Sequence, residues 1–281
     1  MAKTGAATLH IIYRTCAVEN SSPRPEYYSK ALCAASLGLA ISEATISCDL
    51  IVIQDGPEQS EALPVLKPVT GKTITTAGLG NAASLQVAFR FVNSRTDWSD
   101  EDLVYFVEDD YLHTPSAISR LGDAWHLPKS VCYLTLYEHP NAYARGGPNV
   151  KELIHLGPGG HWRTITSTCM TFAARLSCFR RDFRLHMMAA DNDGKPLDYA
   201  LWLAIQGAWP ERALLRYYRS VPTVLSLRGR SLRVAKAHMI MRRTPRTTQL
   251  VAPLPSEATH LDLSAGLARG VDWEQVAMLV R

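Results

Sequence analysis

The sequence predicts an α/β protein built on a mainly parallel sheet, because strand-like runs alternate with helix-like segments along its first half. Apolar runs rich in β-branched residues lie at 9–13, 49–54 and 72–76, which is typical of buried strands. Segments 27–42 and 81–92 carry apolar side chains at helical spacing. Strands that alternate with helices favour right-handed crossovers, and such sheets bind ligands at the carboxyl ends of their strands.

The second half of the chain continues this pattern less regularly. Segment 138–160 is rich in glycine and proline and predicts a mobile loop, a candidate lid over a substrate. The other expected elements are strands at 103–107, 131–136 and 162–172 and helices at 115–125, 197–205 and 273–280.

Length and composition indicate one large folded domain. The 281 residues are 47% hydrophobic, which is enough to bury one sizeable core, and no low-complexity segment suggests disorder. From residue 226 the chain turns basic and is broken by prolines. We therefore expect a domain over 1–225 and a C-terminal extension over 226–281 that completes or covers the functional site.

Charge, hydropathy and cysteine spacing indicate which partners and which cellular compartment to expect. A net charge of +4 is mild and names no partner. No apolar run is long enough for a signal sequence or a membrane span. The six cysteines stand apart without a CxxC pair, so we expect free thiols in a reducing, cytoplasmic setting.

Three consecutive acids, Glu108, Asp109 and Asp110, follow the strand expected at 103–107. Their mutual repulsion is costly without a compensating cation. Magnesium and manganese prefer oxygen ligands and are commonly held by one or two carboxylates together with substrate phosphates and water. The acids therefore predict a divalent metal site, although acids that cap a loop before a helix would give the same pattern.

Four short motifs occur in a fixed order along the first half of the chain. They are Tyr13-Arg14-Thr15, Gln54-Asp55-Gly56-Pro57, Gly78-Leu79-Gly80-Asn81-Ala82-Ala83-Ser84 and Glu108-Asp109-Asp110. This ordered set resembles the GT-A glycosyltransferases, especially their large inverting group. Three positions depart from that family: Gln54 replaces an acid, Pro57 replaces a small polar residue, and Glu108 opens the metal motif.

The resemblance implies a GT-A-type sheet that binds a nucleoside diphosphate sugar. Asp55 would accept a hydrogen bond from a uracil or guanine ring nitrogen, and Asp109 would contact ribose or the donor sugar. Asp110 would be the direct ligand of Mn²⁺ or Mg²⁺, with Glu108 beside it. The other implied nucleotide-binding residues are Tyr13, Arg14, Gly80 and Asn81. Without the resemblance, Asp55 reads as an Asp-Gly turn and the glycines as a simple helix entry.

The resemblance implies further site residues in the second half of the chain. Inverting members place an acid at the start of a helix to deprotonate the acceptor, and Asp198 resembles it; an acid favoured by the helix dipole is the alternative. His238 resembles a late metal ligand and Arg230 a diphosphate contact, whereas a solvated basic tail explains both equally. His113 is a rival metal ligand because it is close to the carboxylates in sequence, and helix capping explains it equally.

A stretch of small polar residues before the end of the strand expected at 162–172 is a candidate lining for an acceptor pocket. β-propensity alone would also explain its threonines. The stretch contains Thr164, Thr166, Ser167 and Thr168.

The function expected from the resemblance is metal-dependent transfer of a sugar, with inversion, from a nucleoside diphosphate sugar to an acceptor hydroxyl; a UDP-sugar is favoured. Nucleotidyl transfer also needs a metal and clustered carboxylates, but no glycine-rich segment with a basic neighbour lies near the first strand. A non-catalytic nucleic-acid- or glycan-binding module is the third alternative, supported by the basic tail. The acceptor stays open among a glycan, a lipid-linked saccharide, a protein and a hydroxylated nucleic-acid base.

Overall fold

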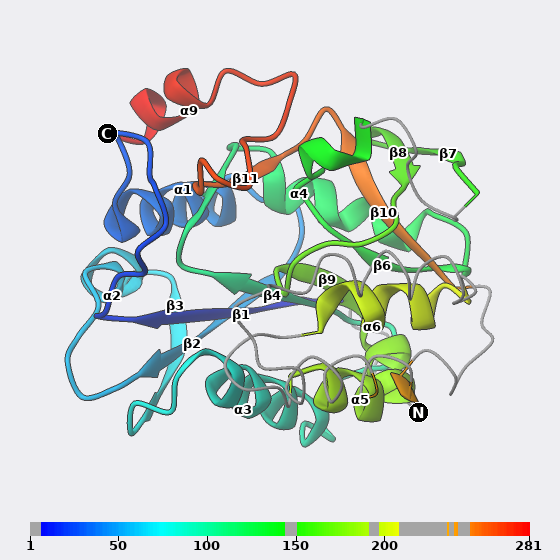
Figure 1. Cartoon of the computed structure of the whole chain (residues 1–281), viewed down its shortest axis with the longest axis horizontal. Coiled ribbons are helices and arrows are strands. Elements are labelled where there is room, and N and C mark those ends of the chain that lie inside the picture. Colours follow the sequence, from blue (N-terminus) through cyan, green and yellow to red (C-terminus); the bar gives the residue numbers. More distant parts are fainter. Residues whose placement is uncertain (1–6, 144–150, 191–196, 208–234, 236–238, 241–247) are drawn as a thin grey trace.

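The computed structural model describes residues 7–143, 151–190, 197–207, 235, 239–240 and 248–281. Within them, one large sheet forms the centre of the molecule (Figure 1). Its strands are β1 (Leu9–Cys16), β2 (Cys48–Asp55), β3 (Thr70–Thr76), β4 (Leu103–Glu108), β6 (Val131–Leu134), β7 (Ile154–Gly157), β8 (Gly160–Thr164), β9 (Phe172–Arg175) and β10 (Gln249–Leu254). They lie in the order β3-β2-β1-β4-β9-β6-β10-β8-β7.

The strand order creates a topological switch point between β1 and β4. The chain runs from β1 outward to β2 and β3, then returns to place β4 on the other side of β1. These four strands are parallel, and β9 is antiparallel to both β4 and β6. In open α/β sheets, the crevice at the carboxyl ends of strands beside such a point is the usual ligand site.

Helices cover both faces of the sheet (Figure 1). The first face carries α1, which packs against α2, α4 and α9, and the second carries α3, which packs against α5, followed by α6. Their bounds are α1 (Lys30–Ser42), α2 (Ala62–Leu66), α4 (Ala117–Leu121), α9 (Trp273–Val280), α3 (Asn81–Asn93), α5 (Leu176–Ala190) and α6 (Asp198–Ile205). The 3₁₀ helices are η1 (Gly122–Trp125) and η2 (Pro140–Tyr143).

Alternation along β1 decides which side chains reach each face. Ile11 and Tyr13 are buried in the cluster that includes α1, whereas Ile12 is buried in the cluster that includes α3. Because successive side chains of a strand point to opposite faces, Arg14 follows Ile12 toward α3 and Thr15 follows Tyr13 toward α1. Both polar residues therefore lie near the end of β1, where the buried apolar part of the strand ends and the expected ligand crevice begins.

The α/β class and the mainly parallel first half of the sheet are confirmed. The strand expected at 162–172 is wrong as a single element, because β8 ends at Thr164 and β9 begins only at Phe172. The expected loop over 138–160 contains β7 and the first residue of β8, which form an antiparallel hairpin. Helix α5 was not predicted, because basic residues interrupt its apolar positions.

The described part of the C-terminal extension is built into the fold. Strand β10 lies inside the large sheet, parallel to β6 and antiparallel to β8. Strand β11 (Ala258–His260) pairs with β5 (Tyr111–His113) directly after the three acids. The expected boundary at 225/226 lies outside the described residues.

Two other expectations from the sequence concern the cysteines and membrane-spanning segments. Cys132 and Cys178 form a disulfide between β6 and α5, with a Cα–Cα distance of 5.9 Å, so the expectation of free thiols is wrong for this pair. In the described part of the chain, every helix is too short or too polar to cross a membrane.

Candidate functional site

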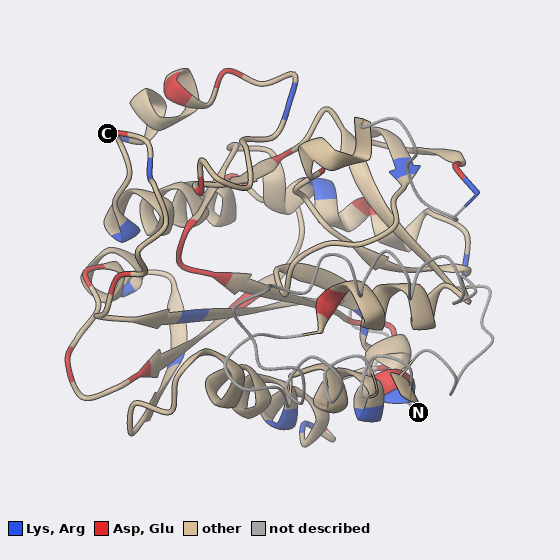
Figure 2. Ribbon diagram, in the orientation of Figure 1, with Lys and Arg blue, Asp and Glu red and all other residues tan. Residues whose placement is uncertain are grey.

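A cavity of about 380 Å³ opens at the carboxyl ends of β1 and β4, at the switch point of the sheet. Figure 2 marks in red the acids where the chain leaves β4 and the acid that begins α6. The cavity brings together residues from all four motifs and from α6. Those predicted from the sequence are Arg14, Asp55, Gly80, Asn81, Glu108, Asp109, Asp110 and Asp198.

Glu108 is paired with Arg14 across the switch point. The two residues are register neighbours on β4 and β1, and the Arg14 guanidinium lies 2.7 Å from Glu108 Oε1. Arg14 also donates to the Asn81 carbonyl (3.1 Å), the Asn81 side chain (3.1 Å) and Ser84 Oγ (2.9 Å) at the start of α3. The guanidinium therefore ties β1, β4 and α3 together.

Asp109 turns to the opposite face, where α1 begins. Its Oδ2 lies 3.1 Å from Lys30 Nζ and accepts a hydrogen bond of 2.7 Å from Thr15 Oγ1. Lys30 is the first residue of α1, a position where the helix dipole disfavours a cation. Nζ donates to the carbonyls of Cys16 (2.7 Å) and Val18 (2.8 Å), so these contacts offset that cost.

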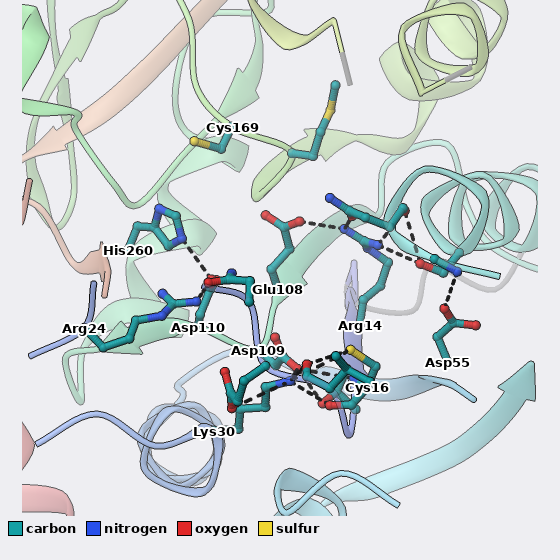
Figure 3. A pocket seen from close by; sticks show the side chains of 18 of the residues that line it. Arg14, Cys16, Arg24, Lys30, Asp55, Glu108, Asp109, Asp110, Cys169 and His260 are labelled. Carbon is teal, nitrogen blue, oxygen red and sulfur yellow. Dashed lines mark hydrogen bonds and ion pairs between the residues drawn. The ribbon is translucent and has the colours of Figure 1, made fainter. Parts of the chain in front are cut away.

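Asp110 contacts two basic side chains (Figure 3). Arg24 and His260 each donate to Oδ2 at 2.9 Å. The pairing of β11 with β5 sets His260 opposite Tyr111, and the two rings stack with centroids 5.0 Å apart. The last described strand of the chain therefore supplies part of the site.

Each acid of the motif thus lies beside a basic side chain, so part of the compensating positive charge expected for the three acids comes from the protein itself. Burial raises the pKa of Glu108 and of Asp109, against the opposing effects of Arg14 and Lys30. Burial would also raise the pKa of Asp110, but His260 and Arg24 outweigh it and hold that pKa below its usual value. The reciprocal contact raises the pKa of His260, although burial alone would lower it.

A divalent metal fits this arrangement only together with substrate oxygens. Within the described ranges, no group of three or more His, Cys, Asp and Glu side chains is positioned to hold a metal ion. Asp110 Oδ1, however, is buried and has no hydrogen-bond partner among the described residues. An orphaned carboxylate oxygen beside a second acid matches the use of one or two carboxylates plus substrate phosphates.

Asp55 holds the turn that leads into α3. Its oxygens accept hydrogen bonds of 2.7 Å from the backbone N–H groups of Leu79 and Gly80. Burial favours a higher pKa for Asp55, but the bonds from Thr76 and from the backbone outweigh it and lower that pKa. Gly80 has φ of +81°, a conformation that glycine adopts without strain. The contacts of Asp55 and the conformation of Gly80 therefore agree with the simpler interpretations of these residues as an Asp-Gly turn and a helix entry.

Other predicted residues lie elsewhere. The Tyr13 side chain is 1% exposed in the core on the α1 side and does not line the cavity. His113 is buried, lies 2.9 Å from the Tyr105 hydroxyl and is likewise not part of the lining. Arg230 and His238 lie outside the described residues.

Sequence reasoning missed the three basic side chains Arg24, Lys30 and His260. Arg24 and His260 are 86 and 150 positions from Asp110, so no local pattern connects them. The position of Lys30 at the start of a predicted helix, against the dipole, is the one signal that could have drawn attention to it.

A second cavity of about 360 Å³ adjoins the first. Asp198 and Cys169 line both cavities, so the carboxylate at the start of α6 lies at their junction. Of the polar stretch expected to line an acceptor pocket, Thr166, Ser167 and Thr168 line this second cavity. Thr164 is instead occupied by hydrogen bonds with residues 151 and 153.

No protein-family model and no curated protein matches the sequence. Among solved structures, a 4-diphosphocytidyl-2C-methyl-D-erythritol synthase aligns with a TM-score of 0.37 and 10% identity, over 64% of this chain and 80% of that chain. The 1–349 fragment of S. aureus TarS aligns with a TM-score of 0.39 and 13% identity, over 65% of this chain. The alignment spans 55% of that TarS fragment, or about half its length.

We predict that Arg14 and Glu108 are strongly coupled. Arg14→Met should lower the free energy of unfolding by about 1–3 kcal/mol, because it leaves a partly buried carboxylate without its cation. Glu108→Gln in the same chain should recover a large part of that loss. Urea unfolding of the two single variants and the double variant measures the coupling energy. Effects of the single variants that simply add would contradict the pairing.

Proposed function

We propose that this chain is a metal-dependent glycosyltransferase that moves a sugar from a nucleoside diphosphate sugar to an acceptor hydroxyl with inversion. The observation that carries the proposal is the pair of adjoining cavities with Asp198 at their junction. One cavity contains acids and cations suited to a diphosphate and a metal, and the other contains polar uncharged groups. A transferase with two substrates needs a separate binding site for each of them, and the two sites must adjoin.

The donor cavity has the charges that a nucleoside diphosphate requires. Arg14, Arg24 and Lys30 line it, and guanidinium and ammonium groups are the usual partners of phosphate oxygens. In the chain without donor these cations neutralise the three acids. When a diphosphate binds, some of these N–H groups can donate hydrogen bonds to its phosphate oxygens instead of to the acids. The acids still reduce the repulsion between the cations.

Glu108 and Asp110 are the residues proposed to hold Mn²⁺ or Mg²⁺, with the orphaned Oδ1 of Asp110 as the main ligand. The metal would supply stabilisation of the negative charge that develops on the departing diphosphate. His238 and Arg230 stay candidates for a further ligand and a diphosphate contact. His260, through its bond to Asp110, fixes the orientation of that carboxylate.

A uridine nucleotide is the favoured donor, with its base near Asp55. A carboxylate has about four acceptor positions, so Asp55 can hold the α3 turn and still accept a bond from a ring N–H. Gly80 and Asn81 line the same end of the cavity. Asp109, held by Thr15 and Lys30, is proposed to face the ribose or the donor sugar.

Asp198 is the proposed general base. Cleavage at the anomeric carbon develops oxocarbenium character, and a carboxylate that takes the acceptor proton makes the attacking oxygen more nucleophilic. Asp198 lines both cavities, so it is placed to serve a hydroxyl in the second cavity and a donor in the first. Attack by that hydroxyl on the face of the anomeric carbon away from the departing diphosphate would invert the anomeric configuration.

We predict that UDP or GDP stabilises the protein only when Mn²⁺ or Mg²⁺ is present. A ligand at 100 times its Kd stabilises the native state by about 2.7 kcal/mol, which thermal unfolding detects. Asp110→Asn should remove this stabilisation. Melting temperatures of the variant with and without nucleotide are compared, so that any loss of stability caused by the substitution itself cancels. Asp97→Asn, at an exposed acid outside the cavity, is the matched control. Equal stabilisation in EDTA would argue against the metal.

We predict that Asp198→Asn lowers turnover by roughly 10²–10⁴-fold with donor affinity nearly unchanged, because it removes only the base. Release of the nucleoside diphosphate from labelled sugar nucleotides measures turnover, and release of the sugar 1-phosphate instead would indicate nucleotidyl transfer. Glu274→Gln, which alters a first-turn acid of α9, controls for the helix dipole. Near-normal turnover of Asp198→Asn, or a product that retains the donor's anomeric configuration by NMR, would overturn the assignment.

A further inference from the structure

Arg24 differs from the other two cations of the first cavity in how its side chain is held. Arg14 donates four hydrogen bonds to β4 and the start of α3, and Lys30 contacts two carbonyls besides its carboxylate. Among the described residues, the Arg24 guanidinium donates to the Leu261 carbonyl (2.7 Å) and to Asp110 Oδ2 (2.9 Å). Fewer contacts must therefore break for this guanidinium to change its partner.

The backbone around Arg24 is fixed, so a change of partner is confined to the side chain. Arg24 lies between Pro23 and Pro25, and proline fixes its own φ and restricts the residue before it. The Pro23 carbonyl accepts a hydrogen bond of 2.9 Å from the backbone N–H of Leu263, in the segment after β11. The guanidinium lies over the Tyr28 ring, 4.5 Å from its centroid. This stacking and the Nη1 hydrogen bond keep the group in place, while Nη2 can exchange one acceptor for another.

We propose that Arg24 is a positioning residue that withholds Asp110 from the metal until the donor diphosphate takes the place of Asp110 as its partner. Arg24 and His260 both point at Asp110 Oδ2 (Figure 3), and a guanidinium 2.9 Å away opposes a second positive charge at the same carboxylate. Arg24 also lines the cavity, and phosphate oxygens are strong acceptors for arginine. The identity of the diphosphate and of the metal rests on the proposed function.

The exchange makes the metal and the nucleotide depend on each other. Without nucleotide, a metal competes with Arg24 for Asp110 and binds weakly. With nucleotide, Arg24 donates to phosphate and Asp110 is left to the metal, while His260 keeps its hydrogen bond to the carboxylate. Because coupling between two ligands is reciprocal, the metal strengthens nucleotide binding by the same factor as the nucleotide strengthens metal binding.

The test measures the affinity for Mn²⁺ by electron paramagnetic resonance and for UDP by calorimetry, for each ligand alone and for both together. When UDP is absent, Arg24→Met should bind Mn²⁺ about tenfold more tightly than the unaltered chain, because a competing positive charge has gone. The factor by which UDP strengthens Mn²⁺ binding should fall about tenfold in the same variant. A purely structural role of Arg24 would give the opposite sign, since damage to the site weakens Mn²⁺ binding.

Three further variants separate the charge of Arg24 from its packing. Arg24→Lys keeps a positive charge beside Asp110, so its affinity for Mn²⁺ without UDP should stay close to that of the unaltered chain. Arg24→Gln removes the charge but keeps a hydrogen-bond donor, so it should repeat the tighter binding even if Arg24→Met does not fold. Arg95→Met is the matched control, because Arg95 also pairs with an acid and lies over aromatic rings, outside the cavity. It should bind Mn²⁺ and UDP as the unaltered chain does.

The proposal is overturned if Arg24→Met and Arg24→Gln bind Mn²⁺ no more tightly than Arg95→Met. It is also overturned if UDP strengthens Mn²⁺ binding equally in all of these chains, or if none of them binds Mn²⁺ with or without UDP.

These outcomes are distinct from failure of the proposed function. Tighter Mn²⁺ binding by Arg24→Met, in a protein that does not bind UDP, would confirm that Arg24 withholds Asp110 from a metal and would remove the nucleotide-sugar transferase. Joint stabilisation of the unaltered chain by UDP and Mn²⁺, with an unchanged affinity for Mn²⁺ in Arg24→Met, would retain the proposed function and remove the role of Arg24.

Discussion

The pairing of three consecutive acids with three separate cations is the constraint on which the site depends. Glu108, Asp109 and Asp110 leave β4 pointing in different directions, so no single basic residue can neutralise them. Glu108 finds its cation on the neighbouring strand, Asp109 at the start of α1, and Asp110 in the connection before α1. Leaving a buried carboxylate without a partner is costly, so the segments that carry these cations are held against the end of β4.

This charge balance prepares the cavity for a second set of charges. A diphosphate and a divalent metal together add charges of both signs, which suits a site that already contains both. The side chains are held by bonds that do not involve substrate, such as those from Arg14 to Asn81 and from Lys30 to the Cys16 carbonyl. Groups held before binding lose little freedom when the ligand arrives, and this preorganisation is a main source of electrostatic catalysis.

The sequence predicted the parts of the fold whose signal is local. Strands β1, β2 and β4 are buried on both faces and read as continuous apolar runs. The carboxyl ends of these strands must meet at one edge of the sheet, so Arg14 and Glu108 could be expected to lie close together. Asp198 could be placed only through the resemblance to inverting enzymes, since an acid at a helix start has a simpler explanation.

The rest depended on contacts between residues far apart in the chain. Strand β10 enters the sheet beside β6 although it is distant in sequence, and β11 brings His260 to Asp110. The histidine predicted for the site was His238, through its resemblance to a late metal ligand, with His113 as its rival. Nothing in the short run around His260 signals a site, since only the pairing of β11 with β5 brings it there. The break between β8 and β9 was not predicted, because the threonines between the two strands have a high β-propensity although they belong to neither strand.

The measurement that tests the central claim most directly is a crystal structure of the chain with UDP and Mn²⁺. The account predicts that the diphosphate lies in the cavity at the ends of β1 and β4, within hydrogen-bond distance of at least one of Arg14, Arg24 and Lys30, with the metal between phosphate oxygens and Asp110. A nucleotide bound outside this cavity, or bound within it with Asp110 still turned to Arg24 and His260 and no metal present, would contradict it.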